Sequence, residues 1–163
     1  RNCLVGSEMC IRDSIWIEEC AKINFEAKPR RYKEGTRTSE DAARQLQCDV
    51  SNIAKSIVFE GQDVAIIVIT SGSNRVDRKK KLKKILGYKP GQASPEYVLE
   101  STGYAVGGVP PFGHLKETIK IIDEDLFKYD LIWGAGGTAD TVFPITPEDL
   151  KEICKAEIRD VKQ

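Results

Sequence analysis

The stretch Val64–Thr70 places the tightest limit on what this chain can fold into. It reads Val-Ala-Ile-Ile-Val-Ile-Thr, and its β-branched residues predict a strand with apolar side chains on both faces. Such a strand must lie in the middle of a sheet that is covered on both sides. Ser56–Phe59 and the turn residues 60–63 precede it, which predicts an antiparallel hairpin. The chain has 163 residues, the size of one domain, which is long enough to bury such a sheet.

Further elements follow on both sides of this hairpin. The basic segment Lys28–Gly35 contains a proline and predicts an extended connection or an edge strand. Helices are expected after the capping residues Thr38, Ser94 and Thr146 and over Arg75–Leu86, and strands over Thr118–Ile122, Leu131–Trp133 and Thr141–Ile145. The order of elements is mixed and shows neither a repeat nor a dividing linker. We therefore expect a single α/β (α+β) domain with a central mixed sheet flanked by helices.

The first residues do not fit this pattern. Arg1–Asp13 has no amphipathic period or capping signal, and Val5–Asp13 is similar to a translated sequencing adapter. We expect residues 1–13 to be non-native or disordered and the domain to span residues 14–163. Ser14 is then expected to cap a helix whose apolar positions are Ile15, Ile17, Ala21 and Ile23.

Composition narrows the function classes. Lys plus Arg and Asp plus Glu both number 25, so any nucleic-acid contact must be local. Five scattered cysteines without a C-x-x-C pair and one histidine predict no metal site. We see no membrane span and no secretory signal, and we expect a cytoplasmic protein without a cofactor.

Ser101–His114 is the first candidate site. It contains four glycines, two prolines and the only histidine of the chain, so it must be a shaped loop. Loops of this kind bring backbone N–H groups close to a ligand. The alternative is a long connection that happens to be rich in glycine.

Gly134–Ala139 has the G-x-G-x-x-A form of a dinucleotide fingerprint. Its context differs, because such a turn should open a helix and Asp140–Pro144 has the pattern of a strand. We interpret it as a glycine turn between strands. Nucleotide binding at this turn is the rival hypothesis.

Two cationic features complete the set of candidates. Lys55 stands at the start of an apolar strand, where it is either a solvated side chain or a cation directed into a pocket. The second feature is a basic run with only Asp77 opposing it. A charge run is usually a solvated face, but this one could neutralise several phosphates. It consists of Arg75, Arg78, Lys79, Lys80, Lys81, Lys83 and Lys84.

Four segments together resemble the YbaK and prolyl-tRNA-synthetase-editing-domain family of aminoacyl-tRNA deacylases. They are Thr36–Ala43, Ile53–Phe59, Asn74–Asp77 and Ser101–His114, and the resemblance covers roughly Ile15 to Val161. It implies a mixed sheet closing into a barrel-like core. It also implies hydrolysis of amino acids wrongly attached to tRNA by a free-standing protein.

The resemblance also implies roles for individual residues. Lys55 falls on the family's nearly invariant lysine, and Gly107–Pro110 falls on its substrate-gripping loop. The match is less clean over Gly134–Asp140, which leaves the amino-acid preference open. The expected residues are Lys55, Gly107 and Gly108 for catalysis, Gly103, Val109, Pro110, His114 and Asp140 for substrate binding, and Arg75, Arg78, Lys79, Lys80 and Lys83 for tRNA binding. Of these, His114 is expected to secure the loop.

The expected activity is trans-editing hydrolysis of misacylated tRNA, for example Cys-tRNA(Pro) or Ala-tRNA(Pro). Backbone amides at Gly107 and Gly108 would stabilise the oxyanion. Water, a ribose hydroxyl or the substrate's own side chain would attack, and pocket size would select the amino acid. The alternatives are a non-catalytic module that binds tRNA or a synthetase, and a small-molecule or nucleotide-binding protein. Whether a synthetase is a partner is left open.

Overall fold

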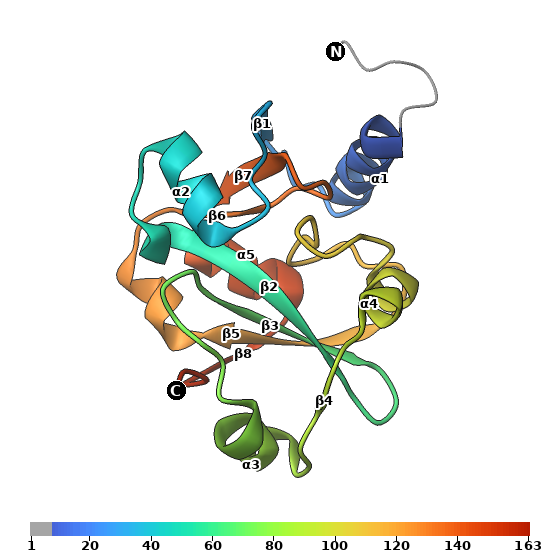
Figure 1. Cartoon of the computed structure of the whole chain (residues 1–163), viewed down its shortest axis with the longest axis vertical. Coiled ribbons are helices and arrows are strands. Elements are labelled where there is room, and N and C mark those ends of the chain that lie inside the picture. Colours follow the sequence, from blue (N-terminus) through green and yellow to red (C-terminus); the bar gives the residue numbers. More distant parts are fainter. Residues whose placement is uncertain (1–7) are drawn as a thin grey trace.

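The computed structural model describes residues 8–163 and contains one mixed sheet of eight strands (Figure 1). The strand order is β1-β7-β6-β2-β3-β5-β8, and β4 pairs with β2 off this path. The strands are β1 (Arg30–Arg31), β2 (Ile53–Glu60), β3 (Ala65–Ser71), β4 (Gly91–Gln92), β5 (Thr118–Asp123), β6 (Ile132–Ala135), β7 (Thr141–Ile145) and β8 (Glu157–Arg159). The α-helices are α1 (Glu8–Lys22), α2 (Ser39–Leu46), α3 (Lys83–Leu86), α4 (Pro95–Thr102) and α5 (Pro147–Cys154). Shorter helical turns are η1 (Val50–Asn52), η2 (Arg78–Leu82) and η3 (Glu124–Lys128).

Strand β3 lies in the middle of the sheet, as its sequence predicts. Every residue of β3 is buried, and the strand pairs antiparallel with β2 and parallel with β5. Ile67 and Ile69 face a core that also contains residues of α1, α4 and α5, whereas Ile66 and Val68 face a second core closed by Leu82. The predicted mixed sheet with flanking helices is therefore confirmed.

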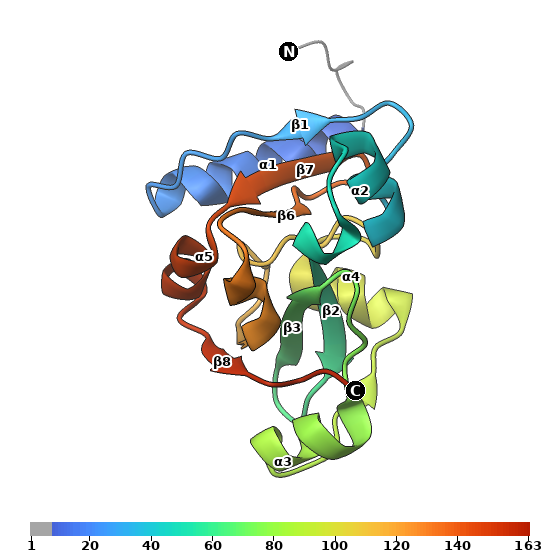
Figure 2. The same ribbon diagram turned by 90° about the vertical axis from the view of Figure 1, so that its left-hand side faces the viewer.

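The strands form two parts that meet at β2. Figure 2 shows β1, β7 and β6 beside α1 at one end of the molecule, and β2 and β3 leading toward α3 at the other end. Helix α2 lies next to the start of β2 in both views. Its buried Ala42 and Ala43 pack with Ile53 and Val142 in a third, smaller core.

N-cap side chains set the first residues of three helices at the positions that the sequence predicts. The side chains of Thr38, Ser94 and Thr146 each accept a hydrogen bond from the backbone N–H three residues later, which satisfies a donor that the first helical turn leaves free. Gly103 ends α4 with φ of 84°, a left-handed conformation that glycine adopts without strain.

Helix α1 begins earlier than expected. It starts at Glu8, so the prediction that Ser14 caps it is wrong. Residues 8–13 contain neither glycine nor proline, so nothing in their sequence stops the helix from extending toward the N-terminus. The expectation for residues 1–7 lies outside the described residues, and the domain start at residue 14 stays a prediction.

The basic helix begins later than expected, at Arg78 instead of Arg75. Val76 forms an antiparallel bridge with Lys162, and the Gln163 N–H donates to the Arg75 carbonyl at 2.9 Å. These contacts hold the segment extended. The Asp77 side chain then accepts from Lys80 N at 3.0 Å and caps the turn that follows.

The sequence did not predict β4 and β8, because strands of two or three residues are too short to show a periodic pattern of apolar side chains. Strand β8 is an exposed edge strand that pairs with β5. Among the described residues, no helix is both long enough and apolar enough to cross a membrane.

Leu82 offers a test of the second core. It is fully buried, with 0% of its surface exposed, so Leu82→Ala should lower the free energy of unfolding by about 2–5 kcal/mol. Denaturant unfolding measures this change. Leu115→Ala is the matched control, because Leu115 is 71% exposed, and it should change stability by less than about 0.5 kcal/mol. Equal effects of the two substitutions would contradict the packing of η2 on β3.

Candidate functional site

A cavity of about 450 Å³ lies where several separate parts of the chain meet. The entry to α2, the first half of β2, the glycine-rich loop after α4, and residues of β6 and β7 form its walls. We call it the β2 pocket. Its polar and glycine lining includes Arg37, Glu40, Lys55, Ser56, Gly107 and Gly134. The sequence-predicted residues Lys55, Gly107 and Val109 are thus brought together, although more than fifty residues separate the lysine from the two others in the chain.

The pocket adjoins an unpaired edge of β2. On the side away from β3, β2 pairs with β6 only at Ile53 and Ala54, and with β4 only at Phe59 and Glu60. Among the described strands, none pairs with residues 55–58 on that side. Backbone groups at a free edge are available to hydrogen-bond a ligand.

The glycine-rich loop is held rigidly where it leaves α4. The Thr102 hydroxyl donates to the Val98 carbonyl at 2.7 Å and accepts from Tyr104 N at 3.1 Å. The Tyr104 hydroxyl reaches across the loop to the Gly113 carbonyl at 3.2 Å. Because these groups are largely buried, the loop has a fixed path and a fixed width.

Phe112 anchors the far side of the loop in the core. Its ring packs at 5.7 Å from Trp16 and 5.8 Å from Phe143, measured between centroids. The Trp16 indole N–H donates to the Phe112 carbonyl at 3.1 Å. Helix α1 therefore fixes the loop through both the side chain and the backbone of one residue.

His114 secures the loop from behind, as the sequence predicts. Its Nε2 lies 2.7 Å from the Pro110 carbonyl and its Nδ1 lies 3.3 Å from the Thr118 hydroxyl. Lys120 donates to that hydroxyl at 2.8 Å, so the hydroxyl proton is directed at Nδ1 and the neutral Nε2–H tautomer fits all three contacts. Burial lowers the pKa of His114 to about 4.

The two central glycines of the loop have different environments. Gly107 has φ of +95°, and a Cβ there would lie 2.7 Å from the Arg37 side chain. Gly108 faces away from the pocket, because its Cβ would lie 2.8 Å from the Thr138 backbone. The Gly108 N–H also donates to the Ala105 carbonyl at 3.0 Å. The loop's own turn therefore already uses this N–H, and the role of Gly108 at an oxyanion stays a prediction.

Lys55 is half-buried at the pocket wall. Burial lowers the pKa of its ammonium group, the carboxylate of Glu40 raises it, and the charge of Arg75 lowers it further. The ammonium thus lies in the field of both a carboxylate and a guanidinium. Its partial loss of hydration strengthens its attraction for an oxygen of a ligand.

Ser56 lines the same pocket with an unsatisfied hydroxyl. Its Oγ is buried and has no hydrogen-bond partner among the described residues. A buried hydroxyl without a partner costs free energy. Groups that destabilise a fold in this way are often retained because they bind a ligand.

Four other predicted substrate-binding residues do not line the pocket. Gly103, Pro110 and His114 shape the loop behind it. Asp140 belongs to the turn between β6 and β7, where it accepts from the Thr138 hydroxyl at 2.6 Å and pairs with Arg31 at 3.4 Å. The sequence placed Asp140 near the site through the neighbouring glycines, but its carboxylate is used to close the turn.

Sequence reasoning missed Arg37, Glu40 and Ser56. Arg37 and Glu40 lie within the Thr36–Ala43 segment, which was noted only for its resemblance. No local pattern separates a pocket residue there from an ordinary helix cap. Ser56 gave no signal, because its hydroxyl is unusual only in its tertiary surroundings.

The predicted tRNA-binding residues divide into two groups. Arg78 donates to the Pro90 carbonyl at 2.8 Å and holds the chain before β4. Arg75, Lys79, Lys80 and Lys83 are exposed, and none forms an ion pair within the described part of the chain. Only this second group is free to meet phosphates.

Among the described residues, no cysteine lines the β2 pocket. The described residues contain no group of three or more potential metal ligands. Burial raises the pKa of the thiols of Cys20 and Cys154 to about 12, which makes both inert at neutral pH.

Comparison with known proteins identifies relatives over most of the chain. A family model described as "Aminoacyl-tRNA editing domain" matches residues 33–153. The protein YwhH of Bacillus subtilis, which is uncharacterized, is 31% identical over 136 residues, covering 83% of this chain and 86% of YwhH. The proline–tRNA ligase of Thermosipho melanesiensis is 35% identical over 102 residues, and this chain spans only 18% of that ligase.

Solved structures agree with these sequence matches. The crystal structure of a candidate trans-editing enzyme for prolyl tRNA synthetase has a TM-score of 0.88 and 36% identity, covering 93% of this chain and 97% of that one. The hypothetical protein APE2540 has a TM-score of 0.83 and 26% identity, with 91% and 99% covered.

Ser56→Ala should stabilise the protein and impair its site. Removing an unpartnered buried hydroxyl should raise the free energy of unfolding by about 1 kcal/mol, which is roughly 2–4 °C in Tm for a chain of this size. Differential scanning calorimetry measures this shift, and a ligand assay measures the loss of affinity. A lower Tm would mean that ordered water satisfies the hydroxyl.

His114 should make stability fall with acidity. Its folded pKa of about 4 lies below the unfolded value of 6.5, so the unfolded chain binds the proton first, and stability is lost as pH falls from about 6.5 to about 4. The loss should be on the order of 3 kcal/mol for a fully developed shift. His114→Gln keeps an amide donor for Pro110 but cannot titrate. A stability difference between the two proteins that stays constant over pH 4–7 would contradict the lowered pKa of the His114 ring.

Proposed function

The chain belongs to the family of aminoacyl-tRNA editing domains, and we propose that it hydrolyses the ester bond of misacylated tRNA in trans. The observation that carries the proposal is the meeting of Lys55 and Gly107 in one pocket of about 450 Å³. Family membership supports editing in general. The free-standing reaction and its substrates are the proposed part.

The pocket offers what hydrolysis of an activated ester needs. The half-buried ammonium of Lys55 can bind the carbonyl oxygen or a neighbouring phosphate. The Gly107 N–H forms no hydrogen bond within the described part of the chain, so it is a loop amide that can stabilise an oxyanion. One such fixed donor contributes about 10²–10³ in rate.

The attacking group comes from outside the protein in this proposal. The Ser56 hydroxyl forms no hydrogen bond to a base among the described residues, and the only histidine uses both ring nitrogens behind the loop. Water, a ribose hydroxyl or the substrate's own side chain can then attack the positioned carbonyl. Glu40 lines the same pocket and can orient the substrate's ammonium group through charge.

The first substrates to examine are tRNAs for proline. Relatives include proline–tRNA ligases and a candidate trans-editing enzyme for prolyl tRNA synthetase, so Cys-tRNA(Pro) and Ala-tRNA(Pro) begin the panel. Release of free amino acid separates a deacylase from a non-catalytic binding module. A module would bind the same RNA without turnover.

Lys55→Ala should fold normally and lose about 10² or more in the single-turnover rate of ester hydrolysis, because an oriented charge is removed. Lys55→Arg should recover little of this loss, since the planar guanidinium presents its donors differently. Lys151→Ala is the control, because Lys151 is an exposed lysine of α5 outside the pocket. Circular dichroism verifies the fold.

A folded Lys55→Ala variant within about threefold of the original rate, roughly 0.7 kcal/mol, would remove Lys55 from the mechanism. Absence of turnover on the whole panel, with RNA binding intact, would instead favour the binding module.

A further inference from the structure

Arg37 is a cation at the wall of the β2 pocket, one residue before the N-cap of α2. Both of its neighbours in the chain are fixed. Thr36 is buried, and its N–H donates to the Ala139 carbonyl at 2.7 Å. Thr38 caps α2 by accepting from Asp41 N at 3.0 Å. The backbone of Arg37 is therefore held at a defined position on the pocket wall.

The side chain of Arg37 lies against Gly107 of the glycine-rich loop. A Cβ at Gly107 would lie 2.7 Å from Arg37 Cγ and 3.1 Å from Arg37 Nε. Two covalent bonds, about 2.5 Å, separate such a Cβ from the amide nitrogen of the same residue, so Arg37 Nε and the Gly107 nitrogen lie within about 6 Å of each other. Two donors that share one acceptor can be that far apart, because each hydrogen bond is about 2.9 Å long.

We propose that Arg37 is a catalytic residue that binds the oxyanion of ester hydrolysis together with the Gly107 N–H. This inference rests on the proposed function, because it adds a residue to the mechanism of the same pocket. The match to the family model gives no role to Arg37.

The oxyanion arises when a nucleophile attacks the ester carbonyl. With water as the nucleophile, a new C–O bond forms, and the π electrons of the carbonyl move onto its oxygen. When the tetrahedral intermediate collapses, the C=O bond forms again and the bond to the ribose oxygen breaks. One proton of the water ends on that ribose oxygen, so the products are the free amino acid and tRNA with a free terminal hydroxyl. Donors that stabilise this transient charge lower the barrier.

Electrostatics favours an anion at this position. The peptide dipoles of α2 place partial positive charge at its first turn, and Arg37 and Lys55 add two full positive charges to the pocket lining. Glu40 is the one carboxylate of that lining. A cation at a helix N-terminus is unfavourable on its own, and a bound oxyanion would relieve the repulsion. Local conflicts of this kind are typical of functional sites.

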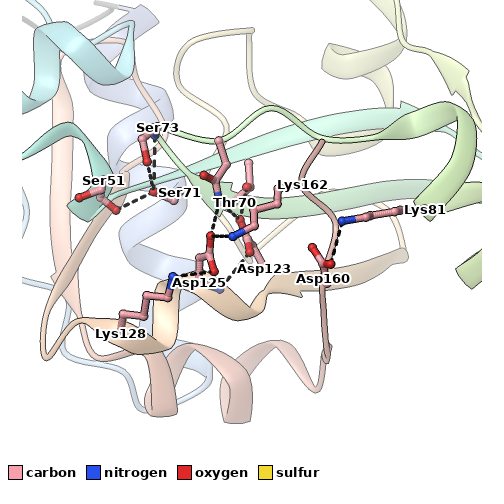
Figure 3. Close-up of polar contacts among 11 residues, drawn as sticks. Ser51, Thr70, Ser71, Ser73, Lys81, Asp123, Asp125, Lys128, Asp160 and Lys162 are labelled. Carbon is pink, nitrogen blue, oxygen red and sulfur yellow. Dashed lines mark hydrogen bonds and ion pairs between the residues drawn. The ribbon is translucent and has the colours of Figure 1, made fainter.

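Arg37 has no ion-pair partner among the described residues, unlike other charged side chains of this protein. Arg44, one to two turns further along the chain, pairs with Asp41 at 2.5 Å. Figure 3 shows the same behaviour near the C-terminus, where Lys162 pairs with Asp125 at 2.8 Å. The guanidinium of Arg37 is thus available to a ligand, and its planar fork can direct N–H groups at one oxygen.

The first test is the single-turnover rate of deacylation on the best substrate of the panel. Arg37→Ala should fold normally and lose about 10² in rate, as for one oxyanion donor. It should bind uncharged tRNA within about threefold of the original affinity, because the contact forms only in the transition state. Arg44→Ala is the matched control and should keep the original rate, since Arg44 is an exposed arginine of α2 outside the pocket.

Chemical rescue separates a catalytic guanidinium from one that binds RNA. Free guanidinium ion, at a concentration too low to unfold the protein, should raise the rate of Arg37→Ala about tenfold, a part of the 10² that one donor contributes. Sodium chloride at the same concentration should not, and guanidinium should not accelerate Arg44→Ala. Absence of rescue together with weakened tRNA binding would overturn the inference.

A phosphate of the RNA is the other anion that Arg37 could bind. An aminoacyl ester of adenosine contains the same carbonyl and no phosphate. Arg37→Ala should lose about 10² in rate on this small ester as well. Equal rates of the original protein and the variant on the ester would assign Arg37 to a phosphate and overturn the inference.

A binding assay tests Arg37 without turnover. It uses two stable analogues of aminoacyl-adenosine, a planar neutral amide and a tetrahedral phosphonate with one negative charge. The original protein and Arg44→Ala should bind the phosphonate at least about tenfold more tightly than the amide, as expected for a transition-state mimic, and Arg37→Ala should lose this preference. An unchanged preference in Arg37→Ala would overturn the inference. The expected pattern without turnover on the whole panel would contradict the proposed activity and leave the oxyanion site standing.

Discussion

Burial of β3 on both faces is the constraint on which the rest of the structure depends. Two cores form because Ile67 and Ile69 point one way and Ile66 and Val68 point the other. Each core needs its own cover, which α1, α4 and α5 give to one face and η2 gives to the other. The hydrophobic effect thus places the glycine-rich loop and the basic turn on opposite sides of the same hairpin.

The β2 pocket follows from the way β2 meets its neighbours. Because β3 occupies one edge of β2, the other edge is shared by β6 at one end and β4 at the other. The part between them stays open, and the loop anchored by Phe112 lies over it. A rigid loop facing a free strand edge can hold a ligand without large rearrangement.

The ammonium group of Lys55 lies in the electric field of charges from two other parts of the chain. Burial lowers the pKa of Lys55, the carboxylate of Glu40 on α2 raises it, and the guanidinium of Arg75 in the segment before η2 lowers it. The segment before η2 is held by buried Asp123, which accepts hydrogen bonds from Thr70, Asn74 and the Asp125 N–H. The C-terminal segment therefore helps to position the cations although it contains no predicted site residue.

The sequence by itself determined β3, the helix caps at Thr38, Ser94 and Thr146, and the loop from Gly103 to His114, because each is set by local periodicity or by the backbone chemistry of a few adjacent residues. It also singled out Lys55 and Gly107. Only the tertiary structure decided that the Gly108 N–H donates to the Ala105 carbonyl, that the Asp140 carboxylate closes a turn, and that the Ser56 hydroxyl lacks a hydrogen-bond partner among the described residues. The surroundings of Ser56 and the pairing of Asp140 with Arg31 depend on segments far apart in the chain. The bonds of Gly108 to Ala105 and of Thr138 to Asp140 are local, but they depend on the exact backbone path of each turn, which no periodic or capping pattern encodes.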